Sequence, residues 1–278
     1  MKCDWKQQVY VMPSIVADVG AAELPGESDG TSMRLINRQG EWHGVSWPCV
    51  PLPRTVARLQ IGEATVLDAR VNGTSEPLTL VNWRPLDHTT VFELIPECRC
   101  PIDGVVAQTC DLIRQMGTPT LRSILAYVFT LPDVFFRYWQ SPASLAHHHS
   151  RPGGLAQHSL EVAVAAASVS GLDCWQRDMV VAYALLHDLG KIWTYRNGRL
   201  TAQARELGHE RLGYREMLSP LVLYSDDDRS TCDVLDELLS GEWKKDCKRP
   251  AAALGDIVRA MDRFSAACDM RNCPTAFG

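Results

Sequence analysis

Apolar residues in the second part of the chain recur at spacings of three and four, which is the period of an α-helix. Seven segments show this pattern after residue 104, and proline or glycine residues separate them. The pattern predicts a mainly α protein with an all-α domain over residues 105–278. The expected helices are 105–116, 120–131, 159–170, 178–189, 202–218, 231–241 and 252–268, with breaks at Pro119, Pro132, Pro142, Pro152, Gly171, Pro220 and Pro250.

The part of the chain before residue 105 has a different pattern. Short runs rich in Val, Leu and Thr at 64–71 and 77–83 flank an Asn-Gly turn signal. They predict a small antiparallel sheet or barrel, of which an OB-like module is one form. Residues 1–32 contain a stretch rich in Gly, Glu and Ser and are expected to form an exposed loop. The predicted domains are therefore 1–104, a leader with a β-rich module that is a candidate for strand binding, and 105–278.

Trp42, Trp47, Trp83 and Arg84 allow two interpretations. They could form a stacking and phosphate-binding surface of the kind that small barrels use to bind single strands. An aromatic side chain at a strand position is more often part of the core, because it buries a large apolar area. The core interpretation is favoured for each tryptophan.

Composition and charge narrow the class of protein. The chain has 278 residues, of which 46% are hydrophobic and 22% charged, as in ordinary globular proteins. Its net charge of -5 gives no overall attraction to nucleic acid, so a polyanion would need a local basic cleft or metal ions. The sequence shows neither a secretory signal nor a membrane-spanning run, which predicts a cytoplasmic protein without a membrane partner. The ten cysteines are scattered and are expected to be free thiols.

The segment 178–189 is apolar on all sides, which predicts a helix buried within the bundle. His187 and Asp188 at its end would lie in a low-dielectric interior. An ionised carboxylate is costly there unless it is paired or coordinates a metal. Lys191 follows directly and could meet a phosphate oxygen or neutralise Asp188.

His158 and Asp262 each interrupt the apolar stripe of another predicted helix. Either residue alone has a plain structural explanation, as a hydrogen-bonded core histidine or as an aspartate paired with a neighbouring arginine. Together with His187 and Asp188 they supply two imidazoles and two carboxylates from three helices. This set suits a divalent transition metal such as Mn, Fe, Ni or Zn.

The order His158, then His187 and Asp188, then Asp262 resembles the H…HD…D ligand pattern of the HD superfamily of metal-dependent phosphohydrolases, which have an all-α fold. The flanking segment "SPASLAHHHSRPGGLAQHSLEVA" is similar to TraI-type HD domains of MobH-class conjugative relaxases and to YhaM-type exoribonucleases. "GRLTAQARELGHERLG" resembles the segment that follows the HD pair in those families and nominates His209. The resemblance covers roughly residues 110–270.

The chain departs from these families in two places. The exoribonucleases carry a histidine-rich stretch where this chain has "ELLSGEWKKDC". The resemblance therefore implies one ion, and a second would need ligands from His209, from the histidines at 147–149 or from Glu242. Relaxases also use a nucleophile, usually a tyrosine, and the sequence does not select one. The available tyrosines are Tyr127, Tyr138, Tyr183, Tyr195 and Tyr214.

Several further residues are candidates for contact with a phosphate or for proton transfer. The candidates for catalysis are Lys191, His209, His148 and His149, and those for substrate binding are His147, Arg151 and Lys191. The three consecutive histidines could instead form a surface turn before Pro152. A basic run, Lys244, Lys245, Lys248 and Arg249, could follow the phosphates of a strand, although a solvated loop is the favoured interpretation.

These observations predict a metal-dependent phosphodiester hydrolase that acts on nucleic acid, either single-stranded DNA or RNA, through water activated by the metal. One alternative is hydrolysis of a nucleotide or another small phosphoester at the same centre. Another alternative is a catalytically idle HD domain that binds nucleic acid within a DNA-transfer system.

Overall fold

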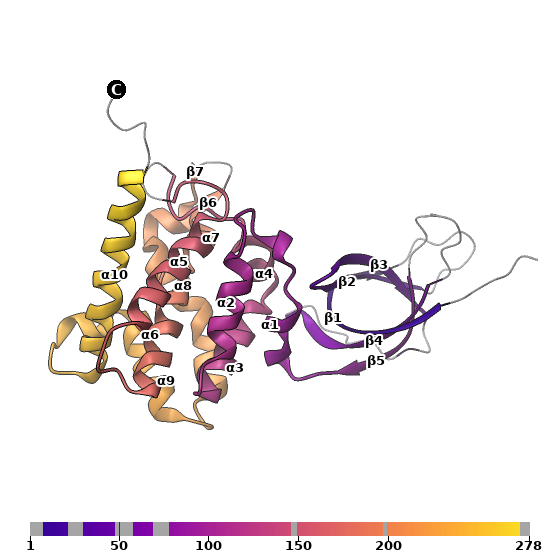
Figure 1. Cartoon of the computed structure of the whole chain (residues 1–278), viewed down its shortest axis with the longest axis horizontal. Coiled ribbons are helices and arrows are strands. Elements are labelled where there is room, and N and C mark those ends of the chain that lie inside the picture. The colour runs from indigo at the N-terminus through magenta and orange to yellow at the C-terminus, as the bar shows by residue number, and fades with distance from the viewer. Residues whose placement is uncertain are drawn as a thin grey trace, which may run out of the picture. The chain divides into compact units, whose positions relative to one another are not determined.

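The computed structural model describes residues 8–21, 30–47, 50, 58–68, 78–145, 149–196 and 199–272. The chain forms two compact units, one comprising Met1–Pro96 with Phe129–Pro132 and the other comprising Glu97–Val128 with Asp133–Gly278. The first unit is a β-barrel and the second is a helical bundle (Figure 1). The mainly α fold with a small β-rich N-terminal module is thereby confirmed.

The barrel consists of five strands in the closed order β1-β2-β3-β5-β4. Its neighbouring strands are antiparallel except for β3 and β5, which pair in parallel. β1 is long enough to pair with β4 through its first half and with β2 through its second half, which closes the sheet on itself. The strands are β1 (Gln8–Ala21), β2 (Thr31–Asn37), β3 (Gly40–Ser46), β4 (Gln60–Asp68) and β5 (Leu78–Pro85).

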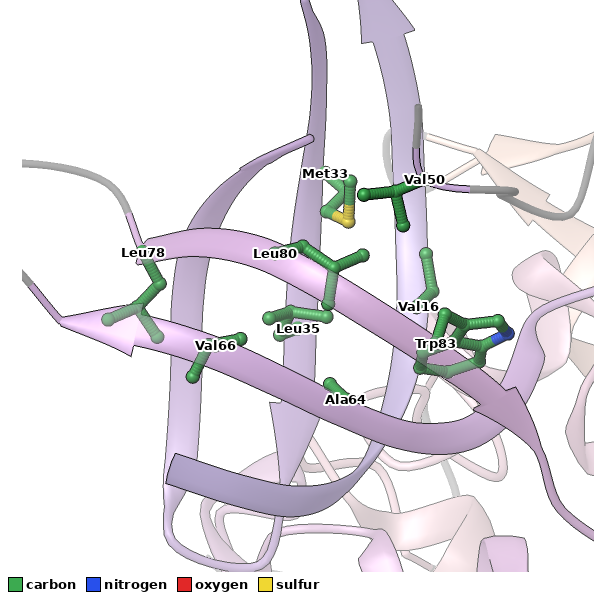
Figure 2. Close-up of a cluster of buried hydrophobic side chains, with 9 residues drawn as sticks. All are labelled: Val16, Met33, Leu35, Val50, Ala64, Val66, Leu78, Leu80 and Trp83. Carbon is green, nitrogen blue, oxygen red and sulfur yellow. The ribbon is translucent and has the colours of Figure 1, made fainter. Parts of the chain in front are cut away.

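Apolar side chains from β1, β2, β4 and β5, together with Val50, fill the barrel (Figure 2). Trp83 is only 7% exposed and belongs to this core, while Trp42 packs against it and is partly buried. The core interpretation of Trp83 is confirmed, and the side chain of the adjacent Arg84 forms an exposed ion pair with Glu63. The core members drawn in Figure 2 are Val16, Met33, Leu35, Val50, Ala64, Val66, Leu78, Leu80 and Trp83.

The expectation of an exposed loop over residues 1–32 is wrong for residues 8–21, which form β1. The residues on either side of Pro13 include Val9, Tyr10, Val11 and Ile15, which favour a strand, and Pro13 interrupts this run. β1 forms backbone hydrogen bonds with β4 on one side and with β2 on the other, and a local sequence pattern does not predict these partners. The predicted Asn-Gly turn lies outside the described residues.

All seven predicted helices are present in the second unit. Pro220 was expected to break a helix but lies inside α8, whose kink occurs instead at Gly208, where the backbone has φ 75°. α5 begins five residues earlier than predicted because Gly153 caps it in a left-handed conformation. The main helices are α2 (Val105–Arg114), α3 (Pro119–Phe129), α4 (Pro132–Arg137), α5 (Gly154–Ala167), α6 (Cys174–Leu186), α7 (Lys191–Thr194), α8 (Ala202–Tyr224), α9 (Arg229–Ser240) and α10 (Pro250–Asn272).

Two of these helices, α5 and α6, are buried along most of their length. α6 begins at a capping box in which Asp173 and Gln176 bond to each other's backbone N–H groups. Its residues from Met179 to Leu186 are all buried, as predicted from their apolar character, and the buried Asp178 accepts hydrogen bonds from Thr118. Among the described helices none has the length and apolar character needed to cross a membrane.

The barrel depends on a glycine at position 62 in β4. A Cβ there would lie 2.2 Å from Cζ2 of Trp83 and 2.7 Å from the carbonyl oxygen of Arg84. We expect Gly62→Ala to destabilise the barrel by about 1–3 kcal/mol, because a rigid ring and a backbone atom must move. Hydrogen exchange should accelerate in peptides from β4 and β5 and stay unchanged in the helical unit. Gly20→Ala is the control, since its nearest contact would be an ordinary 3.9 Å, and equal effects of both variants would contradict the prediction.

Candidate metal centre

Four predicted ligands from three helices converge in the second unit. His158 lies on α5, His187 and Asp188 lie at the end of α6, and Asp262 lies on α10. The Nε2 atom of His158 is 3.0 Å from Oδ1 of Asp262 and 3.7 Å from Oδ2 of Asp188. Nε2 of His187 is 3.4 Å from the same Asp188 oxygen and 3.9 Å from Oδ1 of Asp262. His158, His187 and Asp188 each offer a ligand atom within 4.8 Å of the others, a spacing that suits one metal ion.

The orientation of His187 is fixed by the last turn of α6. Its Nδ1 atom is 2.7 Å from the carbonyl oxygen of Ala184, which cannot donate, so Nδ1 carries the proton. Nε2 is therefore the unprotonated nitrogen when the ring is neutral. This buried atom has no hydrogen-bond partner among the described residues, and it faces two carboxylates. A buried lone pair aimed at two anions is satisfied by a cation, so the residues fit a divalent metal.

The charges around the centre keep its carboxylates ionised. Burial alone would raise the pKa of Asp188, but His187, His209 and Lys191 together hold this pKa well below its usual value. Burial also acts to raise the pKa of Asp262, and here His158 and His187 bring the pKa below its usual value. Both acids can therefore act as anionic ligands.

Lys191 and His209 both contact Asp188, but they are exposed to different degrees. The Lys191 ammonium lies 2.5 Å from Oδ2 of Asp188 and is largely buried, so this ion pair with Asp188 neutralises its charge. His209 places Nε2 3.3 Å from Oδ1 of Asp188 and remains 40% exposed. Of the two, His209 is the residue that faces incoming solutes.

Two glycines bring His209 to the centre. A Cβ on Gly190 would lie 1.8 Å from the carbonyl oxygen of His209 and 2.6 Å from the backbone nitrogen of Gly213. Only backbone atoms fit between the α6–α7 turn and α8 at this point. The left-handed kink at Gly208 then directs the next residue toward Asp188.

A cavity of about 100 Å³ opens beside the candidate metal ligands His187, Asp188 and Asp262. The sequence did not nominate Glu210, it left Tyr183 and Tyr214 unselected among five candidate tyrosines, and it favoured a solvated loop for Lys244. These four residues share the cavity wall with the predicted residues because α6, which carries Tyr183, packs with α8, α9 and the turn after α9, and local sequence patterns do not predict such tertiary contacts. The cavity is lined by Tyr183, Leu186, His187, Asp188, His209, Glu210, Tyr214, Leu238, Leu239, Gly241, Lys244 and Asp262.

The remaining candidates lie elsewhere. His149 is 1% exposed and is absent from the described wall of the cavity, so its buried position does not fit the predicted role in catalysis. Arg151 is half exposed and contacts Asp269 and Gln157, away from the described cavity wall. His147 and His148 lie outside the described residues. The Gly-Gly pair has a structural reason, since a Cβ on Gly154 would lie 2.1 Å from the carbonyl oxygen of His149.

Comparison with known proteins agrees with this geometry. Residues 155–267 match the HD domain family. The 3'-5' exoribonuclease YhaM of Listeria welshimeri is 27% identical over 195 residues, which are 67% of this chain and 61% of the relative. The YhaM of Listeria monocytogenes serovar 1/2a is 30% identical over 194 residues, which are 66% of this chain and 61% of the relative. The YhaM of Bacillus subtilis is 22% identical over 204 residues, which are 69% of this chain and 64% of the relative.

The chain thus spans less than two thirds of the length of these relatives. No solved structure matches the chain. The resemblance to TraI-type domains of relaxases stays a prediction.

The grouping of His158, His187 and Asp188, with Asp262 next to His158, is an arrangement that could bind one divalent cation, as in the class of metal-binding α domains. Within that class, residues 155–267 of this chain match the HD domain family.

Metal binding should stabilise the folded protein. At a free Mn²⁺ concentration of one hundred times the dissociation constant, the expected gain in the free energy of unfolding is about 2.7 kcal/mol. We expect added Mn²⁺ to raise the thermal midpoint of the wild-type protein and to have little effect on His187→Ala. His43→Ala is the control, because this histidine is exposed on β3. An identical Mn²⁺ response of all three proteins would show that the ion binds elsewhere.

Proposed function

We propose that the helical unit is a metal-dependent phosphodiester hydrolase that acts on nucleic acid, with single-stranded RNA as its preferred substrate. The observation that carries this proposal is the unpartnered Nε2 of His187, which faces two carboxylates beside a polar cavity. The relatives named as exoribonucleases support RNA over DNA.

In this proposal His158, His187, Asp188 and Asp262 hold one divalent ion, with Mn, Fe, Ni and Zn as the candidates. The ion, when bound, lowers the pKa of a coordinated water and neutralises charge that develops on the phosphoryl group. Lys191 keeps Asp188 ionised and in place through its 2.5 Å contact.

His209 and Lys244 are the residues that we assign to the substrate. His209 lines the cavity and can donate a proton to the leaving oxygen, since its ring is anchored at Asp188 and still reaches solvent. Lys244 lines the same cavity, and its ammonium is 3.4 Å from both carboxylate oxygens of Glu210. A phosphate can replace this exposed partner at little cost, because exposed ion pairs are weak.

The tyrosines beside the centre favour water over a covalent nucleophile. Burial is the main cause that raises the pKa of Tyr183 to about 12. Burial and the hydrogen bond to Asp236 raise the pKa of Tyr214 to about 12. Both phenols therefore keep their protons near neutral pH and are poor nucleophiles, which supports hydrolysis over a relaxase-like attachment to DNA.

We propose that the closed five-stranded barrel is OB-like and that it contributes to binding of a nucleic-acid strand. Five-stranded barrels of the OB type bind oligonucleotides on the face of their second and third strands. In this chain Trp42 on β3 and Arg34 on β2 lie in those strands.

The activity itself is tested with end-labelled single-stranded RNA, single-stranded DNA and nicked duplex in the presence of Mn²⁺ or Ni²⁺. We expect RNA to be shortened and the rate to fall at least about a hundredfold in His187→Ala and Asp188→Ala, because each removes a metal ligand. Turnover of small phosphoesters alone would instead support a nucleotide phosphohydrolase. Strand binding with normal metal content and no turnover would support an idle binding module.

Lys244→Ala should raise KM for RNA about five- to thirtyfold with a smaller effect on kcat, because it removes one charge-assisted contact to phosphate. Lys244→Arg should retain most of the affinity. Lys245→Ala is the matched control, since this neighbouring side chain is 71% exposed, pairs with Glu242 and is not among the described residues that line the cavity. Equal losses in Lys244→Ala and Lys245→Ala would mean that only the overall positive charge matters.

A further inference from the structure

A single hydroxyl group, that of Ser265, joins three polar groups behind the metal ligands. Its Oγ atom is 3.1 Å from Nδ1 of His158, 3.2 Å from Nε2 of His149 and 2.7 Å from Oε2 of Glu161. His158, His149 and Ser265 are all at least 95% buried, at 0%, 1% and 5% exposed. Water therefore has little access to this junction.

The hydroxyl of Ser265 has only one hydrogen, and this limits which of its three hydrogen bonds it can donate. A hydroxyl has one hydrogen to donate and two lone pairs to accept. The carboxylate of Glu161 can only accept, so the hydroxyl hydrogen points to it across 2.7 Å. Both remaining positions on the oxygen accept hydrogens, and the ring nitrogens that face them are Nδ1 of His158 and Nε2 of His149. Nε2 of His149 also lies 3.1 Å from Oε2 of Glu161, so its proton has two acceptors.

This arrangement favours the tautomer of His158 that carries its proton on Nδ1, and it acts against Asp262, whose Oδ1 lies 3.0 Å from Nε2 and favours a proton there. With its proton on Nδ1, the neutral ring has an unprotonated Nε2, and this is the nitrogen that faces Asp262 and Asp188 at 3.0 and 3.7 Å. His187 is arranged in the same way, since its Nδ1 donates to the carbonyl oxygen of Ala184 and its Nε2 faces the carboxylates. A metal-binding histidine commonly has its other nitrogen held by such an acceptor.

We propose that Ser265 is a positioning residue that holds His158 in the Nδ1-protonated form and so prepares Nε2 to bind a divalent cation. The proposal rests on the metal centre proposed above. Without Ser265, the neutral ring gains more by protonating Nε2 and donating to Asp262, and that proton must leave before a cation can bind.

The sequence places Ser265 in this position by simple helix geometry. It lies three residues after Asp262 on α10, so both side chains are on the same face, one turn apart. One helix thereby contacts both ring nitrogens of His158.

His149 and Glu161 hold the hydroxyl from behind. Glu161 lies one turn after His158 on α5, and its other oxygen accepts from Gln157 at 2.9 Å. The backbone N–H of His149 donates to Asp269 at 2.5 Å, which ties this residue to α10. In this proposal the third histidine of the triple run supports a ligand and does not contact the substrate.

The test compares Ser265→Ala with Ser265→Thr, which keeps the hydroxyl. Nitrogen-15 NMR of histidine in the metal-free protein, at a pH well above the ordinary histidine pKa, reads the tautomer of His158 directly. We expect the Nδ1-protonated form in the wild type and in Ser265→Thr, and the Nε2-protonated form in Ser265→Ala. Ser159→Ala, which removes another buried hydroxyl from the same region, should leave the tautomer unchanged.

Titration calorimetry with Mn²⁺ gives the second readout. We expect Ser265→Ala to bind the ion about ten- to a hundredfold more weakly than the wild type, as is typical when a residue behind a metal ligand is removed, and Ser265→Thr to recover most of the affinity. Circular dichroism establishes that each variant is folded.

An unchanged tautomer together with an unchanged affinity in folded Ser265→Ala would overturn the proposal. A wild-type protein that binds no Mn²⁺ would overturn the metal centre instead. The tautomer comparison needs no metal, so it would still decide whether Ser265 positions His158.

Discussion

The site depends on one costly feature, the carboxylate of Asp188 buried at the end of a helix that is apolar on all sides. The residue is 4% exposed, and a buried ionised carboxylate is unfavourable by several kcal/mol unless cations or hydrogen-bond donors surround it. Lys191 contacts one of its oxygens and His209 the other, while Nε2 of His187 and of His158 lie 3.4 and 3.7 Å from the oxygen that Lys191 contacts. The surrounding donors keep the acid charged, and the charged acid gives the centre its attraction for a cation.

That arrangement requires backbone segments to approach more closely than side chains would permit. Gly190 and Gly213 bring α8 against the turn after α6, and Gly154 brings α5 against the loop that carries His149. Each contact sets the distance of a functional residue from the centre. Gly154 and Gly190, which the sequence pattern marks only as breaks between helices, therefore also determine the geometry of the site.

Much of the helical unit could be predicted because its signals are local. Apolar periodicity locates the seven helices, and a polar residue inside an apolar stripe marks each of His158, His187, Asp188 and Asp262. Features that arise from tertiary contacts escaped prediction. β1 is stabilised by partners on both sides, Pro220 is tolerated within α8, and Lys244 reaches the cavity only through the packing of the turn after α9. The sequence predicted a catalytic role for His149 because it could not show that this residue is buried. The burial comes from contacts with α10, more than one hundred residues away.

The residues around the centre fall into two groups with different physical tasks. His209 and Lys244 are partly exposed and line the cavity, so they can exchange partners when a phosphate arrives. Ser265 and His149 are buried and share hydrogen bonds whose directions are fixed by the number of available protons. A solvated group adapts its hydrogen bonds to whatever binds, whereas a buried group cannot do so without leaving a donor or an acceptor unsatisfied. Specificity for a substrate is therefore expected to change through the exposed pair, and affinity for the metal through the buried pair.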